Sequence, residues 1–285
     1  MKIARFDGGR IGVIAGDQII DVTSICGVDT AEWPPMGMVR VIADFDALRP
    51  KIEAAVAKGG GKPLSGVRLE TPVPWPNKLL ALPNNYAAHS AEMKGRDYAV
   101  GGLAGAGEAG FFMKANSSLC GPADTIELPK DRLDRLFHHE CELAIIVGKR
   151  GRYVKAADAD EYIFGYACLL DMTMRGKEER VMRKSYETFT PVGPWITTRE
   201  EVGPTANLNL NLWVNGELRQ HALVSEMIVG IHEAIEMISA CTTIEPGDII
   251  ASGTMAGVGP VVDGDSVKIT IDNVGTMTLP VKNAK

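Results

Sequence analysis

The sequence predicts a β-rich α+β protein. Short apolar runs bounded by glycine, proline, asparagine or aspartate recur along most of the chain, which is the pattern of strands joined by turns. Apolar residues at helical spacing are confined to a few stretches, and the clearest of these is residues 225–240. The length of 285 residues suggests about two domains at roughly 150 residues each.

The N-terminal part is predicted as a small β/α domain. Two glycine-containing turns separate three predicted strands, at residues 3–6, 11–15 and 19–22. Residues 39–57 then show helical periodicity, which we expect Pro50 to split into two helices. The proline-rich segment 71–76 cannot continue a helix. We therefore expect domains at residues 1–74 and 75–285.

Strands dominate the predicted second domain. They are expected at residues 78–82, 110–113, 125–128, 140–147, 162–170, 208–214, 248–251 and 266–271. Short and long helices are expected at residues 86–94 and 225–240. Between the first helix and the next strand, residues 100–107 hold too many glycines to fix one conformation, so we expect a flap that orders on ligand binding.

Composition excludes several classes of protein. Hydrophobic residues make up 45% and charged residues 23%, as in a globular chain rather than a disordered one. The net charge is -6 without a clustered Lys/Arg tract, so a nucleic-acid surface is not expected. The longest uncharged apolar segment, residues 162–170, falls far short of the ~20 residues that cross a bilayer, so no membrane span is expected.

The N-terminus and the cysteines predict the compartment. Acidic residues and glycines interrupt the first apolar residues, so no secretion signal is expected. The 5 cysteines are scattered and lack a C-x-x-C pair, which argues against a disulfide framework and a thiolate zinc site. We therefore expect a cytoplasmic protein.

Three acidic residues predict a metal site. Glu140 and Glu142 are two apart on a predicted strand, so they share one face. The strand continues into an apolar run, where two unpaired carboxylates would repel each other and a divalent cation would hold them. Asp171 ends another apolar strand and offers a third oxygen. Oxygen donors favour magnesium, manganese or calcium over zinc. On spacing alone, a solvated edge strand for the glutamates and a turn cap for Asp171 remain alternatives.

Four further features indicate chemistry. His89 and Glu92 form an i,i+3 pair, in which the carboxylate can orient the ring as a base, although such pairs also occur as surface ion pairs. Lys184 is a candidate active-site residue, although it could equally be a solvated surface lysine. The glycine-rich turn 253–259 could offer backbone N–H groups to an anion or be a tight loop. His138 or His139 could help to orient the two glutamates without binding the metal itself.

Six segments in the same order resemble motifs of the fumarylacetoacetate hydrolase family, and the resemblance covers residues 78–281. The matching segments are N-Y-A-A-H-S-A-E at 85–92, E-C-E-L-A at 140–144, D-M-T-M-R at 171–175, K-S-Y-E-T-F with P-V-G-P-W at 184–195, N-G-E-L-R-Q at 215–220 and S-G-T-M-A-G-V-G at 252–259.

The resemblance implies a mixed β-sandwich roll, a homodimer and a magnesium-type cation on Glu140, Glu142 and Asp171. The cation would chelate the oxo and carboxylate oxygens of a 2-oxo acid. Lys184 would neutralise the developing enolate, and His89, oriented by Glu92, would activate water. The remaining implied contacts are to substrate, from Arg175, Gln220, Gly253 and Thr254.

The implied reaction is hydrolysis of a carbon–carbon bond in an acylpyruvate or related dioxo acid. Relatives with the same site include 2-oxo acid decarboxylases and keto-enol isomerases, so these remain alternatives. A non-catalytic small-molecule sensor is a third, although intact His89, Glu92 and Lys184 argue against it. Between Asp171 and Lys184 the spacing of 184 − 171 = 13 residues is shorter than in many relatives, which leaves the substrate open.

Overall fold

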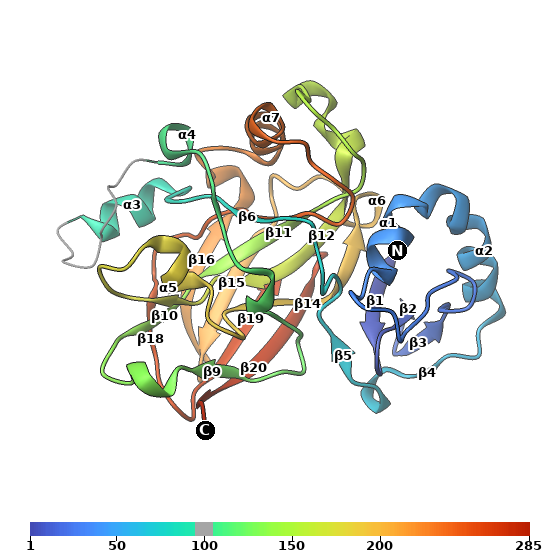
Figure 1. Ribbon diagram of the computed structural model, residues 1–285, viewed down its shortest axis with the longest axis horizontal. Helices are drawn as coiled ribbons and strands as arrows, with labels where there is room; N and C mark the ends of the chain where they lie inside the picture. The colour runs from blue at the N-terminus through green and yellow to red at the C-terminus, as the bar shows by residue number, and fades with distance from the viewer. Residues whose placement is uncertain (95–104) are drawn as a thin grey trace.

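The computed structural model describes residues 1–94 and 105–285, and its architecture is that of a β-sandwich with helices at its edges (Figure 1). Of the predicted flap at residues 100–107, residues 100–104 lie outside the described residues, and residues 106 and 107 begin a short helix, α4 Ala106–Ala109. Within the described ranges, no helix has the length and apolar character needed to cross a membrane.

A 12-stranded mixed sheet forms the larger layer, and ten of its strands follow the order β4-β3-β2-β1-β14-β12-β11-β17-β6-β7. The sheet also takes in β5, which pairs with β1, and β8, which pairs with β14. The bounds along the chain are β1 Lys2–Phe6, β2 Arg10–Ala15, β3 Gln18–Asp21, β4 Lys62–Pro63, β5 Leu69–Glu70, β6 Leu79–Ala81, β7 Phe112–Met113, β8 Leu119–Cys120, β11 Cys141–Val147, β12 Ile163–Leu170, β14 Thr190–Thr198 and β17 Ile249–Ala251.

Two smaller sheets complete the strand layers. The second layer of the sandwich has 5 strands in the order β16-β15-β19-β20-β9, and a third sheet has 3 in the order β13-β10-β18. Their bounds are β9 Ile126–Leu128, β10 Phe137–His139, β13 Thr173–Met174, β15 Asn209–Val214, β16 Glu217–Leu223, β18 Gly259–Val261, β19 Ser266–Ile271 and β20 Gly275–Asn283. The predicted β-rich α+β fold class is therefore confirmed, and the sheets formed by residues 1–94 and 105–285 do not close into a barrel.

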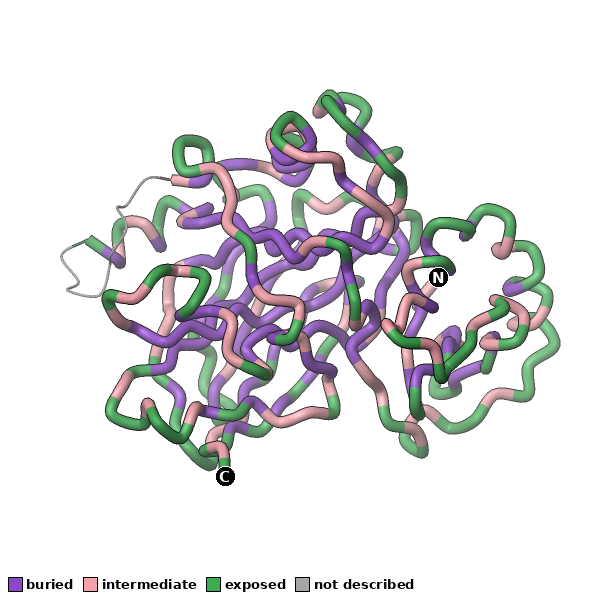
Figure 2. Tube along the Cα trace, viewed as in Figure 1, coloured by how far each residue is buried: buried purple, intermediate pink, exposed green. Residues whose placement is uncertain are grey.

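The apolar run of β11 is explained by burial on both faces of the large sheet. Leu143 and Ile145 belong to the core between the two layers, whereas Ala144 and Ile146 belong to a second core that includes residues of helices α1 (Gly37–Ala43) and α2 (Phe45–Lys58). Because alternate side chains point to opposite faces, a strand covered on both sides is apolar throughout. Figure 2 shows the central strands as the most continuous buried part of the chain.

The N-terminal strands form the predicted meander, but they are not a separate sheet. β1 pairs with β14 through Lys2↔Thr197 and Ile3↔Ile196, so the meander extends the large sheet. An irregular segment separates β5 from β6, where the sequence places its domain boundary. The boundary at residue 74 stays a prediction.

Seven α-helices lie in the described ranges, and two predicted boundaries were wrong. The helices are α1 Gly37–Ala43, α2 Phe45–Lys58, α3 Ala87–Met93, α4 Ala106–Ala109, α5 Arg180–Lys184, α6 Arg199–Val202 and α7 Ile231–Cys241. The break in the first helical stretch is at Asp44 rather than Pro50, which lies inside α2. A proline near the start of a helix gives up its own N–H bond, and packing of the apolar face can outweigh that loss.

The last helix begins at Ile231 rather than at residue 225. The backbone N–H groups of Ile228 and Val229 donate to Asn85, to its carbonyl and its side chain respectively, each at 2.8 Å. These bonds hold Ile228 and Val229 in a bend between the short 3-10 helix Val224–Glu226 and α7, although Met227 and Ile228 match the helical periodicity of α7. Tertiary contacts thus override a local pattern.

Candidate active site

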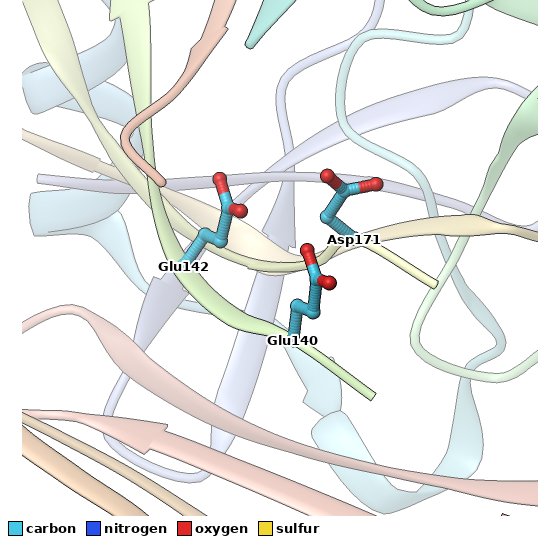
Figure 3. A group of neighbouring side chains, drawn as sticks. All are labelled: Glu140, Glu142 and Asp171. Carbon is cyan, nitrogen blue, oxygen red and sulfur yellow. The ribbon is translucent and has the colours of Figure 1, made fainter. Parts of the chain in front are cut away.

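The three acidic residues lie together at one end of the large sheet (Figure 3). Antiparallel pairing of β11 with β12 sets Cys141 opposite Leu170, so that Glu140 and Asp171 become neighbours across the strands. The Asp171 N–H donates to the Glu140 carbonyl at 2.9 Å. One oxygen of each carboxylate lies within 4.8 Å of the others, and all three residues are buried. The solvated edge strand is therefore wrong, because β11 lies between β12 and β17.

Buried cations surround this carboxylate cluster, which we define as Glu140, Glu142 and Asp171. Lys184 Nζ donates to Glu140 Oε2 at 2.7 Å and to Asp171 Oδ2 at 2.5 Å. Its third bond goes to Thr173 Oγ1 at 2.7 Å, so each of its protons has an acceptor. Lys184 is therefore not a solvated lysine.

A second buried lysine was missed by the sequence reasoning. Lys114 Nζ donates to Asp171 Oδ1 at 2.5 Å and to the Phe189 carbonyl at 2.9 Å. Lys114 directly follows the apolar residues 111–113, just as Asp171 ends an apolar strand. The sequence signal that could have predicted Lys114 is therefore a charged residue directly after an apolar run.

The pKa values of Glu140 and Glu142 are shifted in opposite directions. Burial alone would raise the pKa of Glu140, but the charges of Lys184 and Arg175 hold that pKa well below its ordinary value. Burial, followed by repulsion from Asp171, raises the pKa of Glu142. A carboxyl with a raised pKa next to another carboxylate is one that a cation would stabilise as the anion.

The donor set fits a hard divalent cation. The cluster presents oxygen ligands from three carboxylates, the set that magnesium, manganese and calcium prefer. A carboxylate has about four lone-pair sites, so an oxygen that accepts from lysine can still bind a metal. Glu142 is further oriented by the Gly253 N–H, which donates to its Oε2 at 2.8 Å.

His89 and Glu92 form the predicted pair on α3. His89 Nδ1 lies 3.1 Å from Glu92 Oε2, and the Gly257 N–H donates to Glu92 Oε1 at 3.2 Å. The histidine is buried. Just before the helix, the Asn85 side-chain amide donates to the carbonyls of Val229 at 2.9 Å and Ser252 at 2.8 Å. Asn85 thus anchors the start of α3, and the Gly257 N–H anchors Glu92. Glu92 in turn orients the His89 imidazole as a base requires.

The four residues predicted to contact substrate bind protein groups. Arg175 Nη2 donates to Glu140 Oε1 at 2.8 Å, and Gly253 donates to Glu142. Thr254 Oγ1 accepts from Gln220 Nε2 at 2.9 Å. The structure therefore places all four around the carboxylate cluster, and their contact with substrate stays a prediction.

The remaining histidines divide by burial. His139 Nδ1 lies 3.0 Å from Gln220 Oε1, and burial lowers the pKa of His139, so its neutral ring donates from Nδ1. His138 is also buried, whereas His221 and His232 are exposed. His139 thus helps to hold the carboxylate cluster indirectly, through its hydrogen bond to Gln220.

Known proteins resemble this chain over its whole length. A family model described as fumarylacetoacetate (FAA) hydrolase C-terminal matches residues 78–282. The maleylpyruvate hydrolase of Aquipseudomonas alcaligenes is 41% identical over 288 residues, with 99% of this chain and 100% of that protein covered.

Solved structures show the same fold. The maleylpyruvate hydrolase of Sphingobium sp. SYK-6, in complex with manganese(II) ion and pyruvate, is 50% identical with a TM-score of 0.90, and 100% of both chains is covered. A 5-carboxymethyl-2-hydroxymuconate delta-isomerase from Mycobacterium smegmatis is 31% identical with a TM-score of 0.76, again over 100% of both chains. The relatives therefore include hydrolases and isomerases.

Proposed function

The chain belongs to the fumarylacetoacetate hydrolase family, and from that membership we propose that it hydrolyses maleylpyruvate to maleate and pyruvate. It is a metal-dependent enzyme that acts on a carbon–carbon bond of an acylpyruvate-type dioxo acid. The observation that carries the proposal is the buried carboxylate cluster with Lys184 bound between two of its members. The manganese and pyruvate in the Sphingobium structure support it, because pyruvate is one of the two products.

The cluster residues would hold the metal. When bound, a divalent cation supplies Lewis-acid polarisation and a template for the 2-oxo acid end of the substrate. Lys184 Nζ would orient toward the negative charge that develops on oxygen as the bond breaks, in a site from which bulk water is excluded. Arg175 would align Glu140 through its bond to Oε1.

His89 would act as the base. Because Nδ1 faces Glu92, the ring would take the proton of water at Nε2. The water oxygen forms a bond to the acyl carbon, and the carbon–carbon bond breaks with its electron pair left on the pyruvate fragment. The proton held by His89 can return to that carbon, which completes pyruvate, and the acyl carbon becomes a carboxylic acid that releases the second proton of the water to solvent, which leaves maleate.

Three finer features belong to the same proposal. The physiological cation would be manganese or magnesium, with calcium as the weaker candidate. The family resemblance supports a homodimer, which light scattering coupled to gel filtration would test. Cytoplasmic location is proposed from the cysteine pattern and would be tested by cell fractionation.

Product analysis in labelled water tests the reaction. We expect maleylpyruvate and Mn²⁺ in H₂¹⁸O to give pyruvate and maleate, with one ¹⁸O in maleate from a single turnover. Release of carbon dioxide without maleate would favour a decarboxylase. A rearranged double bond without cleavage would favour an isomerase. Binding without any turnover would favour the sensor.

A further inference from the structure

Gln220 lies on β16, and both the oxygen and the nitrogen of its side-chain amide form hydrogen bonds to other protein groups. Oε1 accepts from the Cys141 N–H and from His139 Nδ1, both at 3.0 Å. Nε2 donates to Thr254 Oγ1 at 2.9 Å and to the Met255 carbonyl at 3.0 Å. The two donors and two acceptors around it fix the orientation of the amide, because the flipped form would oppose donor to donor. The side chain is buried.

These bonds secure the strand position between the two glutamates of the cluster. The Cys141 N–H donates to Gln220, and the Thr254 hydroxyl donates to the Cys141 carbonyl at 2.9 Å. Together with the bond between Gln220 and Thr254, this closes a ring of hydrogen bonds around the backbone N–H and carbonyl of Cys141. Since Cys141 lies between Glu140 and Glu142, the ring fixes the spacing and direction of both carboxylates.

The same turn, residues 252–257, also reaches the base. Its Gly253 N–H donates to Glu142 and its Gly257 N–H donates to Glu92, the partner of His89. Gly257 has φ +96°, and a Cβ there would lie 1.9 Å from the Arg219 carbonyl oxygen. The turn therefore lies directly against β16, and Gln220 on that strand bonds both to the turn and to the Cys141 N–H.

We propose that Gln220 is a positioning residue that holds the metal-binding carboxylates and the His89–Glu92 pair in one frame. It acts through Cys141, Thr254 and Met255 rather than by touching the reacting atoms. The inference rests on the proposed function only for its kinetic part. Its metal-binding part does not depend on which oxo acid is the substrate.

The test compares Gln220→Leu with His221→Leu. His221 is the next residue of β16, is exposed, and has its Nδ1 within 2.8 Å of Asn211 Oδ1 on the neighbouring strand β15. Metal-free protein is titrated with Mn²⁺, and free Mn²⁺ is read from its EPR signal. We expect Gln220→Leu to weaken Mn²⁺ binding by roughly 10–100-fold, the usual effect of losing a group that orients metal ligands, while His221→Leu binds as the wild type does.

Two further readouts address the base. At saturating Mn²⁺ we expect kcat for maleylpyruvate to stay at least about tenfold below wild type. We also expect backbone amides 87–93 and 252–258 to exchange hydrogen faster in Gln220→Leu. Restoration of full kcat and wild-type hydrogen exchange by excess metal would overturn the claim that Gln220 positions the His89–Glu92 pair as well as the metal-binding carboxylates.

If Gln220→Leu does not fold, Thr254→Val removes two bonds of the ring, to Gln220 and to the Cys141 carbonyl, with little change in volume. We expect a folded Thr254→Val to weaken Mn²⁺ binding in the same direction. A folded Gln220→Leu or Thr254→Val with Mn²⁺ affinity within about twofold of wild type would overturn the proposal. Failure of maleylpyruvate hydrolysis by the wild type, with the Mn²⁺ result intact, would refute the proposed substrate and not this role.

Discussion

Lys184 Nζ lies 2.5 Å from Asp171 Oδ2 in a buried ion pair. The same ammonium group contacts Glu140, so two members of the carboxylate cluster share one lysine. Burial would lower the pKa of Lys184, but the charges of Asp171 and Glu140 hold that pKa above its ordinary value. The lysine is therefore a fixed positive charge beside the metal ligands, where an enolate oxygen would gain its negative charge.

Replacing this charge should slow catalysis more than it weakens metal binding. We expect Lys184→Met to lower kcat by roughly 10²–10³-fold, because a preorganised donor to the developing charge is lost. Lys282→Met, at an exposed position of β20, is the matched control and should have wild-type kcat. Steady-state kinetics at saturating Mn²⁺ make the comparison. A Lys184→Met enzyme with undiminished kcat would contradict the role.

Removing the imidazole of His89 should separate proton transfer from metal binding. We expect His89→Ala to lower kcat by about 10²–10⁴-fold, because the base that activates water is absent. Mn²⁺ affinity should stay at the wild-type value. His232→Ala removes an exposed imidazole instead and should leave kcat unchanged. Unchanged turnover in His89→Ala would refute the water-activation role.

A methyl group at Gly257 should disturb both stability and activity. Alanine at a positive φ costs roughly 1–3 kcal/mol of unfolding free energy, which Gly264→Ala should also show. Gly264 has φ +91° and nothing within 4 Å of its Cβ position, so it measures the backbone cost alone. Gly257→Ala must additionally displace the turn from the Arg219 carbonyl, so we expect a larger loss in denaturant unfolding. Its kcat should also fall, because the turn holds Glu92.

Equal unfolding free energies and equal kcat for Gly257→Ala and Gly264→Ala would contradict the close approach at Gly257. The pair is informative because both residues have positive φ, and only one of them lies against the backbone of another strand.

The carboxylate cluster could be predicted from the sequence because its signals are local. Alternation along a strand puts Glu140 and Glu142 on one face, and Asp171 interrupts an apolar run. The structure adds the register of β11 against β12, which brings Asp171 to them. Lys114 approaches Asp171 from 57 positions away, so no local pattern connects the two.

The elements that the sequence did not predict depend on non-local contacts in the same way. Strand β14 contains Pro191 and Pro194, which normally argue against a strand. Its pairing with β12 runs through the flanking residues and shifts register between Tyr166 and Cys168. The start of α7 is set by Asn85, which lies 144 positions from Val229. Neither interaction leaves a trace in the periodicity of its own segment.

Direct measurement of Mn²⁺ binding tests the central claim that Glu140, Glu142 and Asp171 hold the catalytic metal. EPR titration of metal-free protein should show one tight Mn²⁺ site per chain in the wild type and in Glu217→Ala, which removes an exposed glutamate of β16. In Glu142→Ala the site should be lost together with activity. Mn²⁺ at about 100 times its Kd should also stabilise the wild-type fold by about 2.7 kcal/mol and leave Glu142→Ala unchanged. Wild-type Mn²⁺ affinity in a folded Glu142→Ala would contradict the account.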